Sequence, residues 1–118
     1  MRNIHSLKTN KEFRIVYSKK HSFANKYLIM YVLENKLEKT RLGISVSKKV
    51  GNSVVRHRVT RLIRESFRLN QHILKNGIDI IIVARPLAKE QGFKEIESAM
   101  LHLSKMHHIL DSNSKKDD

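Results

Sequence analysis

The sequence RLGISVSKKVGNSVVRHRVTRLIRESFR, residues 41–68, changes its hydrophobic periodicity halfway along. Over residues 41–47, apolar side chains alternate with small ones, which is the pattern of a half-buried strand. A loop with Gly51 follows, and over residues 54–75 the apolar positions recur every three or four residues, which predicts a long amphipathic helix. Asn76-Gly77 should end this helix, with Gly77 in the left-handed conformation. The strand and helix together make one unit of an α+β fold.

The rest of the chain adds two helices and two strands to this unit. Thr9-Asn-Lys-Glu12 has the form of a capping box, which predicts that a short helix starts there. Residues 27–33 and 78–84 are rich in β-formers and are predicted strands. The first is apolar on both faces, so it should be covered on both sides. The second is nearly continuously apolar, so it should be buried in the sheet. A last helix is predicted over residues 89–108.

Length and composition limit the classes of protein that fit. The 118 residues suit a single domain, which we place at residues 1–110, followed by a polar tail over 111–118 that we expect to be disordered. The absence of cysteine excludes disulfides and cysteine-based zinc sites. No apolar run approaches the length of a membrane helix, and the N-terminus lacks the apolar core of a secretory signal. We therefore expect a cytoplasmic protein with no membrane partner.

The net charge of +13 is confined to part of the chain. Lys and Arg exceed Asp and Glu by six over residues 1–40 and by seven over 41–68, whereas the two balance over 69–118. Excess charge gathered in one region is typical of a surface that binds a polyanion. Nucleic acid is the partner that this distribution favours, above an anionic membrane.

The predicted long helix concentrates this charge. Five arginines and no lysine lie between residues 54 and 68, and the side opposite the apolar stripe is almost entirely cationic. Arginine suits bidentate phosphate contacts, whereas an ordinary solvated helix face mixes both signs of charge. The loop before the helix adds two lysines and exposed backbone N–H groups. The predicted RNA-binding residues are Lys48, Lys49, Asn52, Arg56, His57, Arg58, Arg61, Arg64 and Arg68.

No pattern in the sequence indicates catalysis or metal binding by the protein itself. The seven histidines include no helical pair at i, i+4 with a nearby carboxylate. His57 has no evident partner to orient it as a general base. Asp79 begins a buried strand, where a local hydrogen-bonding role is expected. We therefore assign neither catalytic residues nor a protein-bound cofactor.

Two adjoining blocks closely resemble the signature of the bacterial ribonuclease P protein subunit family. They are GISVSKKVGN, residues 43–52, and VRHRVTRLIRE, residues 55–65, and they match in order and spacing. The resemblance extends from the first helix to the last. His57 stands where the family has Asn, which keeps a polar donor. Thr60 stands where the family commonly has Lys, which removes one charge from the surface.

The resemblance implies the fold in more detail than the periodicity does. It implies a small single-domain α/β sandwich of the α+β class, with element order α-β-β-β-α-β-α. The additional strand would lie near Ser22-Phe23. The family also has a left-handed crossover around the basic helix, against the general right-handed rule for parallel strands.

The implied function is processing of precursor tRNA by a ribonucleoprotein endoribonuclease. The RNA subunit would carry out catalysis with Mg²⁺, and the protein alone would be inactive. The implied partners are the catalytic RNA and precursor tRNA, with no obligate protein partner. The 5′ leader would lie in a cleft between the first helix and the sheet, with stacking on aromatic rings. The matching cleft residues are Phe13, Tyr17, Tyr31, Ser45 and Ser47.

Two other readings remain open from the residues. One is a ribosomal-type RNA-binding protein with no processing role, which would share the basic helix. The other is a helix-turn-helix DNA-binding protein. It fits poorly, because a strand and a loop precede the basic helix where a partner helix is expected.

Overall fold

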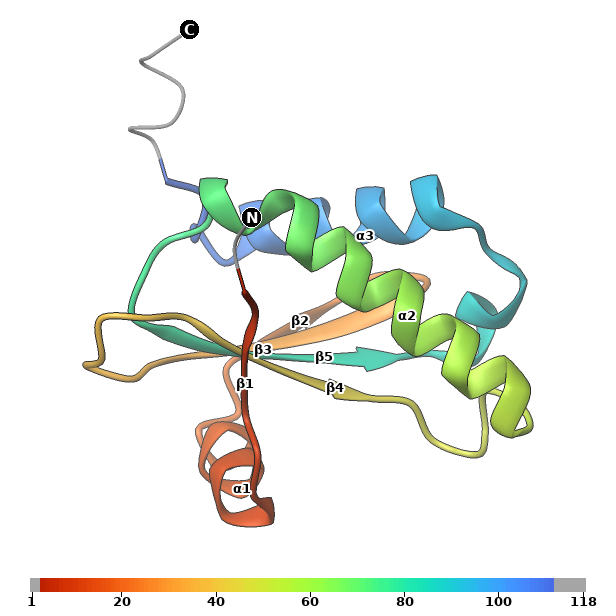
Figure 1. Ribbon diagram of the computed structural model, residues 1–118, viewed down its shortest axis with the longest axis horizontal. Coiled ribbons are helices and arrows are strands. Elements are labelled where there is room, and N and C mark those ends of the chain that lie inside the picture. Colours follow the sequence, from red (N-terminus) through yellow and green to blue (C-terminus); the bar gives the residue numbers. More distant parts are fainter. Residues whose placement is uncertain (1–2, 112–118) are drawn as a thin grey trace, which may run out of the picture.

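The computed structural model describes residues 3–111. The five strands and three helices follow one another in the order β1-α1-β2-β3-β4-α2-β5-α3 (Figure 1). Their bounds are β1 (His5–Ser6), α1 (Asn10–Ser18), β2 (Ser22–Ala24), β3 (Leu28–Glu34), β4 (Arg41–Ser45), α2 (Ser53–Asn70), β5 (Ile78–Ala84) and α3 (Phe93–Met106). Two 3₁₀ segments, Gln71–Ile73 and Pro86–Glu90, connect the later elements.

The strands form one mixed sheet in the order β1-β4-β5-β3-β2. β5 lies at its centre, parallel to β4 and antiparallel to β3, with Ile81 beside Gly43 and Tyr31. Every residue of β5 except Val83 is buried. The prediction of a nearly continuously apolar strand buried in the sheet is confirmed.

The two faces of the sheet are covered by different helices. α2 and α3 lie over one face, where they enclose the larger core with Met30, Ile80 and Ile82, while α1 lies over the other face (Figure 1). The smaller core under α1 centres on Val16 and Ile81. β3 was predicted to be apolar on both faces, and the reason is that a core lies on each side of the sheet.

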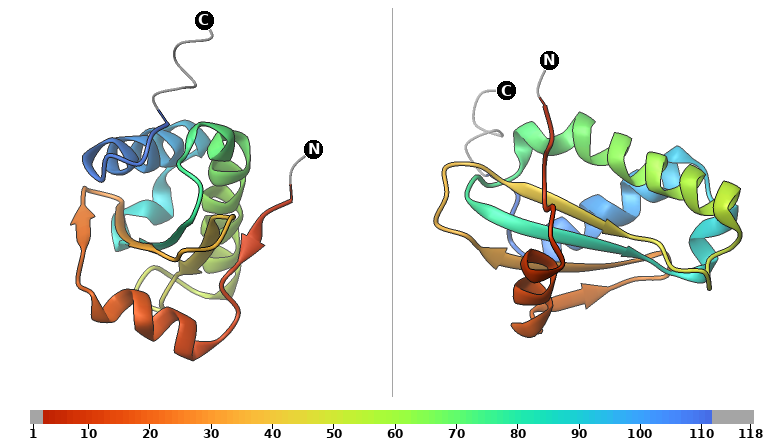
Figure 2. Two further views of the ribbon diagram at one scale, coloured as in Figure 1. Left: turned by 90° about the vertical axis from the view of Figure 1, so that its left-hand side faces the viewer. Right: turned by 60° about the horizontal axis from the view of Figure 1, so that its bottom comes forward.

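The connection from β4 through α2 to β5 is left-handed. The two strands are parallel neighbours, and α2 crosses the face shared with α3 (Figure 2). With the strands pointing up and the helix toward the viewer, β5 lies to the left of β4 (Figures 1 and 2). Most parallel crossovers have the opposite hand. The expectation taken from the family resemblance is confirmed, as is the short strand at Ser22–Ala24.

The first helix begins as the sequence predicts. Thr9 Oγ1 accepts a hydrogen bond from the backbone N–H of Glu12 at 3.1 Å. Glu12 Oε1 in turn accepts from the N–H groups of Thr9 at 3.0 Å and Lys8 at 2.6 Å. These backbone hydrogen bonds are the main reason that the pKa of Glu12 is lowered.

The long helix is shorter than predicted. α2 ends at Asn70, not at residue 75, because the next segment pairs with the residues that follow α3: Leu74 forms a bridge with Leu110, and Lys75 N donates to Ile109 O at 2.7 Å. Gly77 has the predicted positive φ of 79°. It serves the turn before β5 and does not cap a helix.

Three further boundaries differ from the prediction. The last helix starts at Phe93, because Gln91 and Gly92 are extended, and ends at Met106, shortly before His108 takes a positive φ of 57°. The strand β4 ends at Ser45. Strand β1 was not predicted, since two residues carry no periodicity. The predicted tail has only Asp111 within the described residues; residues 112–118 lie outside them.

Candidate RNA interface

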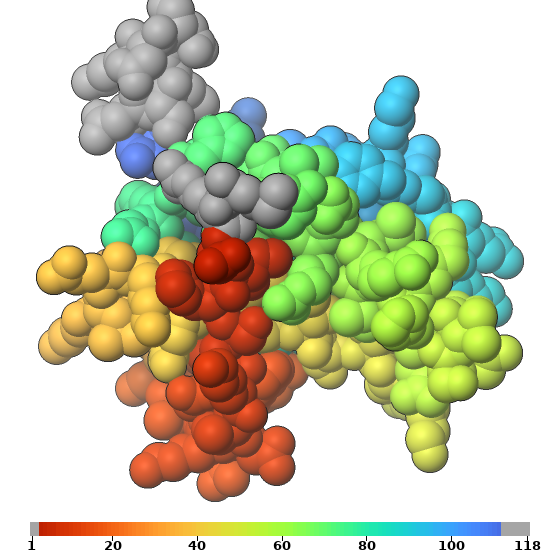
Figure 3. Space-filling view, viewed as in Figure 1, coloured from red at the N-terminus to blue at the C-terminus, as the bar shows by residue number. Residues whose placement is uncertain are grey.

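The helix α2 separates its apolar and cationic sides as its sequence predicts. Val59, Ile63, Ser66 and Phe67 are buried against the sheet and α3. Ser66 is satisfied inside the helix, since its hydroxyl donates to the Leu62 carbonyl at 2.8 Å. Burial of this stripe fixes the rotation of the helix, so the arginine side faces outward. Figure 3 shows α2, in yellow-green to green, exposed along one face of the molecule beside β1.

Three predicted RNA-binding residues project freely from this outer side. His57, Arg61 and Arg64 are exposed, and none forms an ion pair with another residue between 3 and 111. Their hydrogen-bonding capacity is available to a ligand. Unpaired guanidinium groups one helical turn apart are suited to successive phosphates of a nucleic acid.

The other arginines of α2 have protein contacts. Arg58 donates from Nη1 to the Lys89 carbonyl at 3.0 Å and from Nη2 to the Gln91 carbonyl at 2.6 Å. Its charge stays unneutralised, but the side chain holds the segment before α3. Arg68 pairs with Glu65 through two hydrogen bonds of 2.9 and 2.5 Å. Among the described residues, Arg68 is thus the arginine of α2 that has a carboxylate partner.

Arg56 and Thr60 interact within one helical turn. Thr60 Oγ1 donates to the Arg56 carbonyl at 2.8 Å, so the residue that replaces the family's lysine is turned toward its own helix. Arg56 is half-buried, and its Nε lies buried without a hydrogen-bond partner among the described residues. The rest of its guanidinium is the part left for an RNA contact.

The loop before α2 presents cations at the start of the helix. Lys48 and Lys49 are exposed, and Asn52 is the N-cap, with its Oδ1 accepting from Val55 N at 3.0 Å. Asn52 Nδ2 remains available, because the cap uses only the oxygen. The first-turn N–H groups and the two lysines together make this end of α2 attractive to an anion.

The predicted aromatic set lies together on the other face of the sheet, against α1. The rings of Tyr17 and Tyr31 meet edge to face with centroids 4.8 Å apart, and Phe13 lies 6.4 Å from Tyr17. All three are half-buried. Burial raises the pKa of Tyr17, against a hydrogen bond with the Ser45 side chain that lowers it. The hydroxyl is thus neutral over the physiological range.

Gly43 sets how closely α1 approaches the sheet. A Cβ at this position would lie 2.7 Å from two ring carbons of Phe13 and 3.0 Å from Leu7 Cδ1. The ring therefore rests directly on the backbone of β4. Ser45 continues the same face and is half-buried, whereas Ser47 follows the strand in an exposed loop. Of the two serines, Ser45 is the one in contact with the rings.

Sequence reasoning missed the residues that join α1 to the sheet. Arg41 Nη1 donates to Glu12 Oε2 at 3.0 Å, and Asp79 accepts from Arg41 and from Asn35 Nδ2. Asp79 thus has long-range partners rather than the local hydrogen bond expected for it. A buried carboxylate next to an apolar run was a signal for such a partner, but the sequence does not say which cation supplies it.

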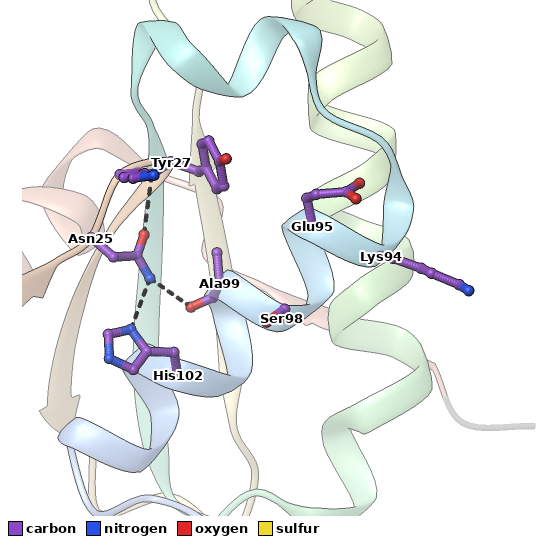
Figure 4. A pocket seen from close by; sticks show the side chains of 8 residues that line it. Asn25, Tyr27, Lys94, Glu95, Ser98, Ala99 and His102 are labelled. Atoms are coloured by element: carbon purple, nitrogen blue, oxygen red, sulfur yellow. Dashed lines mark hydrogen bonds between the residues drawn. The ribbon is translucent and has the colours of Figure 1, made fainter.

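A separate cavity of about 420 Å³ lies between the β2–β3 turn and α3 (Figure 4). Asn25 forms one side of it. Its Nδ2 donates to the Ala99 carbonyl at 3.0 Å and lies 3.2 Å from His102 Nδ1. None of the predicted RNA-binding or leader-cleft residues lines this cavity.

No helix between residues 3 and 111 is both long and apolar enough to cross a bilayer. Over the same part of the chain, His, Asp and Glu side chains form no group of three or more that could hold a metal ion.

The mixed sheet, the left-handed crossover and the cationic face of α2 define a small α+β RNA-binding protein. A family model described as Ribonuclease P matches residues 1–108. The chain is 59% identical over 108 residues to the ribonuclease P protein component of Lachnoclostridium phytofermentans, covering 92% of this chain and 93% of that one. The corresponding protein of Alkaliphilus metalliredigens is 56% identical over 103 residues, covering 87% and 93%.

Solved structures agree with these relatives. The RNase P protein of Staphylococcus aureus superimposes with a TM-score of 0.83 at 36% identity, covering 92% of this chain and all of that one. The RNase P protein of Thermotoga maritima gives a TM-score of 0.78 at 25% identity, covering 86% and 96%. The chain belongs to the ribonuclease P protein family. It is a subunit of that endoribonuclease and a partner of its RNA; the ribosomal-type alternative is not favoured.

Proposed function

We propose that this chain binds the catalytic RNA through the outer side of α2 and the 5′ leader of precursor tRNA through the aromatic face at α1. The RNA subunit, with Mg²⁺, cuts the leader from the tRNA. The protein supplies binding energy and no reacting group. These partners place the protein in the cytoplasm, and no second protein is required.

The contact with the catalytic RNA rests on charge and on arginine geometry. Arg61 and Arg64 are exposed and unpaired among the described residues, and the lysines of the loop extend the cationic surface to the start of α2. The partner is polyanionic, so each phosphate contact releases counterions and makes the affinity depend on salt. Arg58 contributes its charge while its hydrogen bonds hold the protein backbone.

The leader contact rests on the cluster of rings. Tyr17 and Tyr31 meet edge to face, and Phe13 lies on the backbone of Gly43. Single-stranded RNA exposes base faces that stack on such rings, at roughly 1–3 kcal/mol per base. The Ser45 hydroxyl supplies a polar group beside the rings, on the same face of the sheet.

The titratable groups of this chain with lowered pKa values have structural partners, which is consistent with assigning catalysis to the RNA. The pKa of Glu12 is lowered chiefly by backbone hydrogen bonds in the capping box, and the pKa of Glu65 chiefly by Arg68. His107 has a lowered pKa chiefly because it is buried, and its Nε2 contacts the Met30 carbonyl. Each of these shifts is explained by a structural contact, so none of the three groups is poised as a general acid or base.

The observation that carries the proposal is the contact of Tyr17 with Tyr31 beside Ser45. Tyr17→Leu keeps apolar bulk and removes the ring. We expect it to weaken binding of precursor tRNA to the holoenzyme about tenfold and to leave mature tRNA unchanged, because only the precursor has a leader. Tyr27→Leu is the matched control, since this half-buried tyrosine lines the separate cavity instead. Equal loss for both tRNAs would reject the leader site.

A cleavage assay tests the division of labour. Protein freed of RNA should leave precursor tRNA intact, and addition of the cognate RNA at physiological Mg²⁺ should release the 5′ leader. Leader removal by the RNA-free protein would overturn the assignment of catalysis to the RNA.

A further inference from the structure

A groove separates the N-terminal segment from the outer side of α2. It has a volume of about 410 Å³, within the range of roughly 300–1,000 Å³ typical of small-ligand sites. β1, which brings this segment to the helix, pairs in parallel with β4 at the sheet edge. The lining residues are Ile4, Arg61, Leu62, Arg64, Glu65 and Arg68.

The lining of the groove combines apolar side chains with exposed cationic ones. Ile4 and Leu62 are half-buried and pack against the main core, so they form the apolar part of the groove lining. Arg68 is engaged by Glu65 through both Nε and Nη2, which neutralises its charge and fixes the plane of its guanidinium. Arg61 and Arg64 keep their charges, since neither forms an ion pair within residues 3–111.

We propose that this groove accepts a single unstacked base of the ribonuclease P RNA, with Arg61 and Arg64 binding the phosphates on either side of it. The inference rests on the proposed contact of α2 with that RNA. A surface that binds only phosphates does not need apolar residues such as Ile4 and Leu62. An unstacked nucleotide needs both parts, because its base has a π-face and its backbone is anionic.

The arrangement also distinguishes an unstacked base from a duplex. In an RNA helix the bases are stacked and only their edges are reachable. Ile4 and Leu62 are less exposed than Arg61 and Arg64, which would meet the backbone, so a base must leave the stack to reach the apolar pair. The fixed guanidinium plane of Arg68 offers such a base a flat surface on which to stack.

The test is binding of the cognate ribonuclease P RNA as a function of salt concentration. Ile4→Ala removes apolar surface and no charge, so we expect the affinity to fall about five- to tenfold with the salt slope unchanged. Arg61→Gln should lower the affinity and also reduce the slope, by about 0.7–0.9 for each lost phosphate contact. Chemical probing of the RNA should show one base protected by the wild-type protein and reactive with Ile4→Ala.

Leu101→Ala is the matched control, because Leu101 is a half-buried residue that packs against the same core and does not line the groove. It should bind as the wild type does. Ile4→Val, which removes less surface, should fall between wild type and Ile4→Ala, and it provides the measurement if the alanine variant folds poorly.

The outcomes separate this inference from the proposed function. If Ile4→Ala binds normally while Arg61→Gln still weakens binding and flattens the slope, the base site is wrong and the RNA face stands. If Ile4→Ala lowers both affinity and slope, Ile4 only positions the arginines, and the base site is again wrong. If Arg61→Gln and Arg64→Gln both bind normally, the proposed function of α2 itself fails.

Discussion

Arg41 donates two parallel hydrogen bonds to the carboxylate of Asp79, from Nε to Oδ1 and from Nη2 to Oδ2, each 2.8 Å long. Asp79 is only 4% exposed. The third nitrogen of the same guanidinium, Nη1, donates to Glu12 in the capping box of α1. One arginine of β4 thereby connects the central strand to the helix that carries two of the three rings, and it fixes where that helix begins.

Removal of the Asp79 charge should destabilise the fold. Asp79→Asn leaves the Arg41 guanidinium without its buried counterion, and breaking a buried pair costs roughly 3–5 kcal/mol. Because the Arg41 side chain is 21% exposed, water replaces part of the interaction, and we expect a loss of about 2 kcal/mol in the free energy of unfolding. Urea denaturation measures it. Glu65→Gln, at an exposed pair, should change the midpoint far less; equal shifts would contradict this reading.

A methyl group at Gly43 should act on the leader site through Phe13. The Cβ of Gly43→Ala would lie 2.7 Å from the ring, which must move and displace the start of α1. We expect a loss of about 1 kcal/mol in stability. Discrimination between precursor and mature tRNA by the holoenzyme should also fall.

Gly92→Ala is the control for this substitution. Its nearest neighbour would be Glu95 Oε1 at 3.3 Å, the end of a flexible side chain. Tight discrimination retained in Gly43→Ala, despite the lower stability, would show that the ring position does not matter for the leader.

The buried His107 should make stability depend on pH. Its Nε2 donates to the Met30 carbonyl at 2.8 Å, and its Nδ1 is buried with no acceptor among the described residues, so there is no favourable place for a second proton. Burial lowers the pKa below its usual 6.5. The unfolded state therefore binds the proton more readily, and stability is present above pH 6.5 and lost as the pH falls from there through the lowered pKa.

Thermal unfolding of the wild type and His107→Gln at several pH values between about 8 and 5 tests this dependence. The glutamine amide can still donate to the Met30 carbonyl but does not titrate, so the variant should show a flatter profile. His72→Gln, at an exposed histidine, should keep the wild-type slope. A wild-type profile that is already flat over this interval would refute the prediction.

Substitutions of Arg58 and Arg61 should differ in their effect on the stability of the protein, although both residues carry charge on the same helix. In Arg58→Lys one ammonium group replaces a guanidinium that spans the Lys89 and Gln91 carbonyls, and we expect a loss of about 1 kcal/mol. Arg61→Lys removes no contact within the described residues and should unfold at the wild-type midpoint. Both variants keep their charge, so the salt slope of RNA binding should be unchanged in each.

The local pattern of the sequence was sufficient for the helices, the longer strands and the orientation of α2. The capping box at Thr9 needs only four successive residues, and the apolar stripe through Val59 and Ile63 fixes which side faces out. The Glu65–Arg68 pair was also within reach, since residues at i, i+3 are neighbours on a helix. The motif order around Gly43 identified the family, and through it the left-handed crossover.

The sequence by itself therefore determined the helices, the longer strands and the cationic side of this protein, because periodicity, capping and short-range pairing act between residues close in the chain. Only the tertiary structure decided that Arg41 joins Asp79 to Glu12, that Arg58 binds backbone carbonyls, and that Ile4 lines a groove together with residues of α2. These contacts join residues that are dozens of positions apart in the sequence. Every residue has a backbone carbonyl, so the residue type does not reveal which carbonyl accepts a hydrogen bond. Packing of the whole sheet decides which distant residues come into contact, and no local pattern encodes that packing.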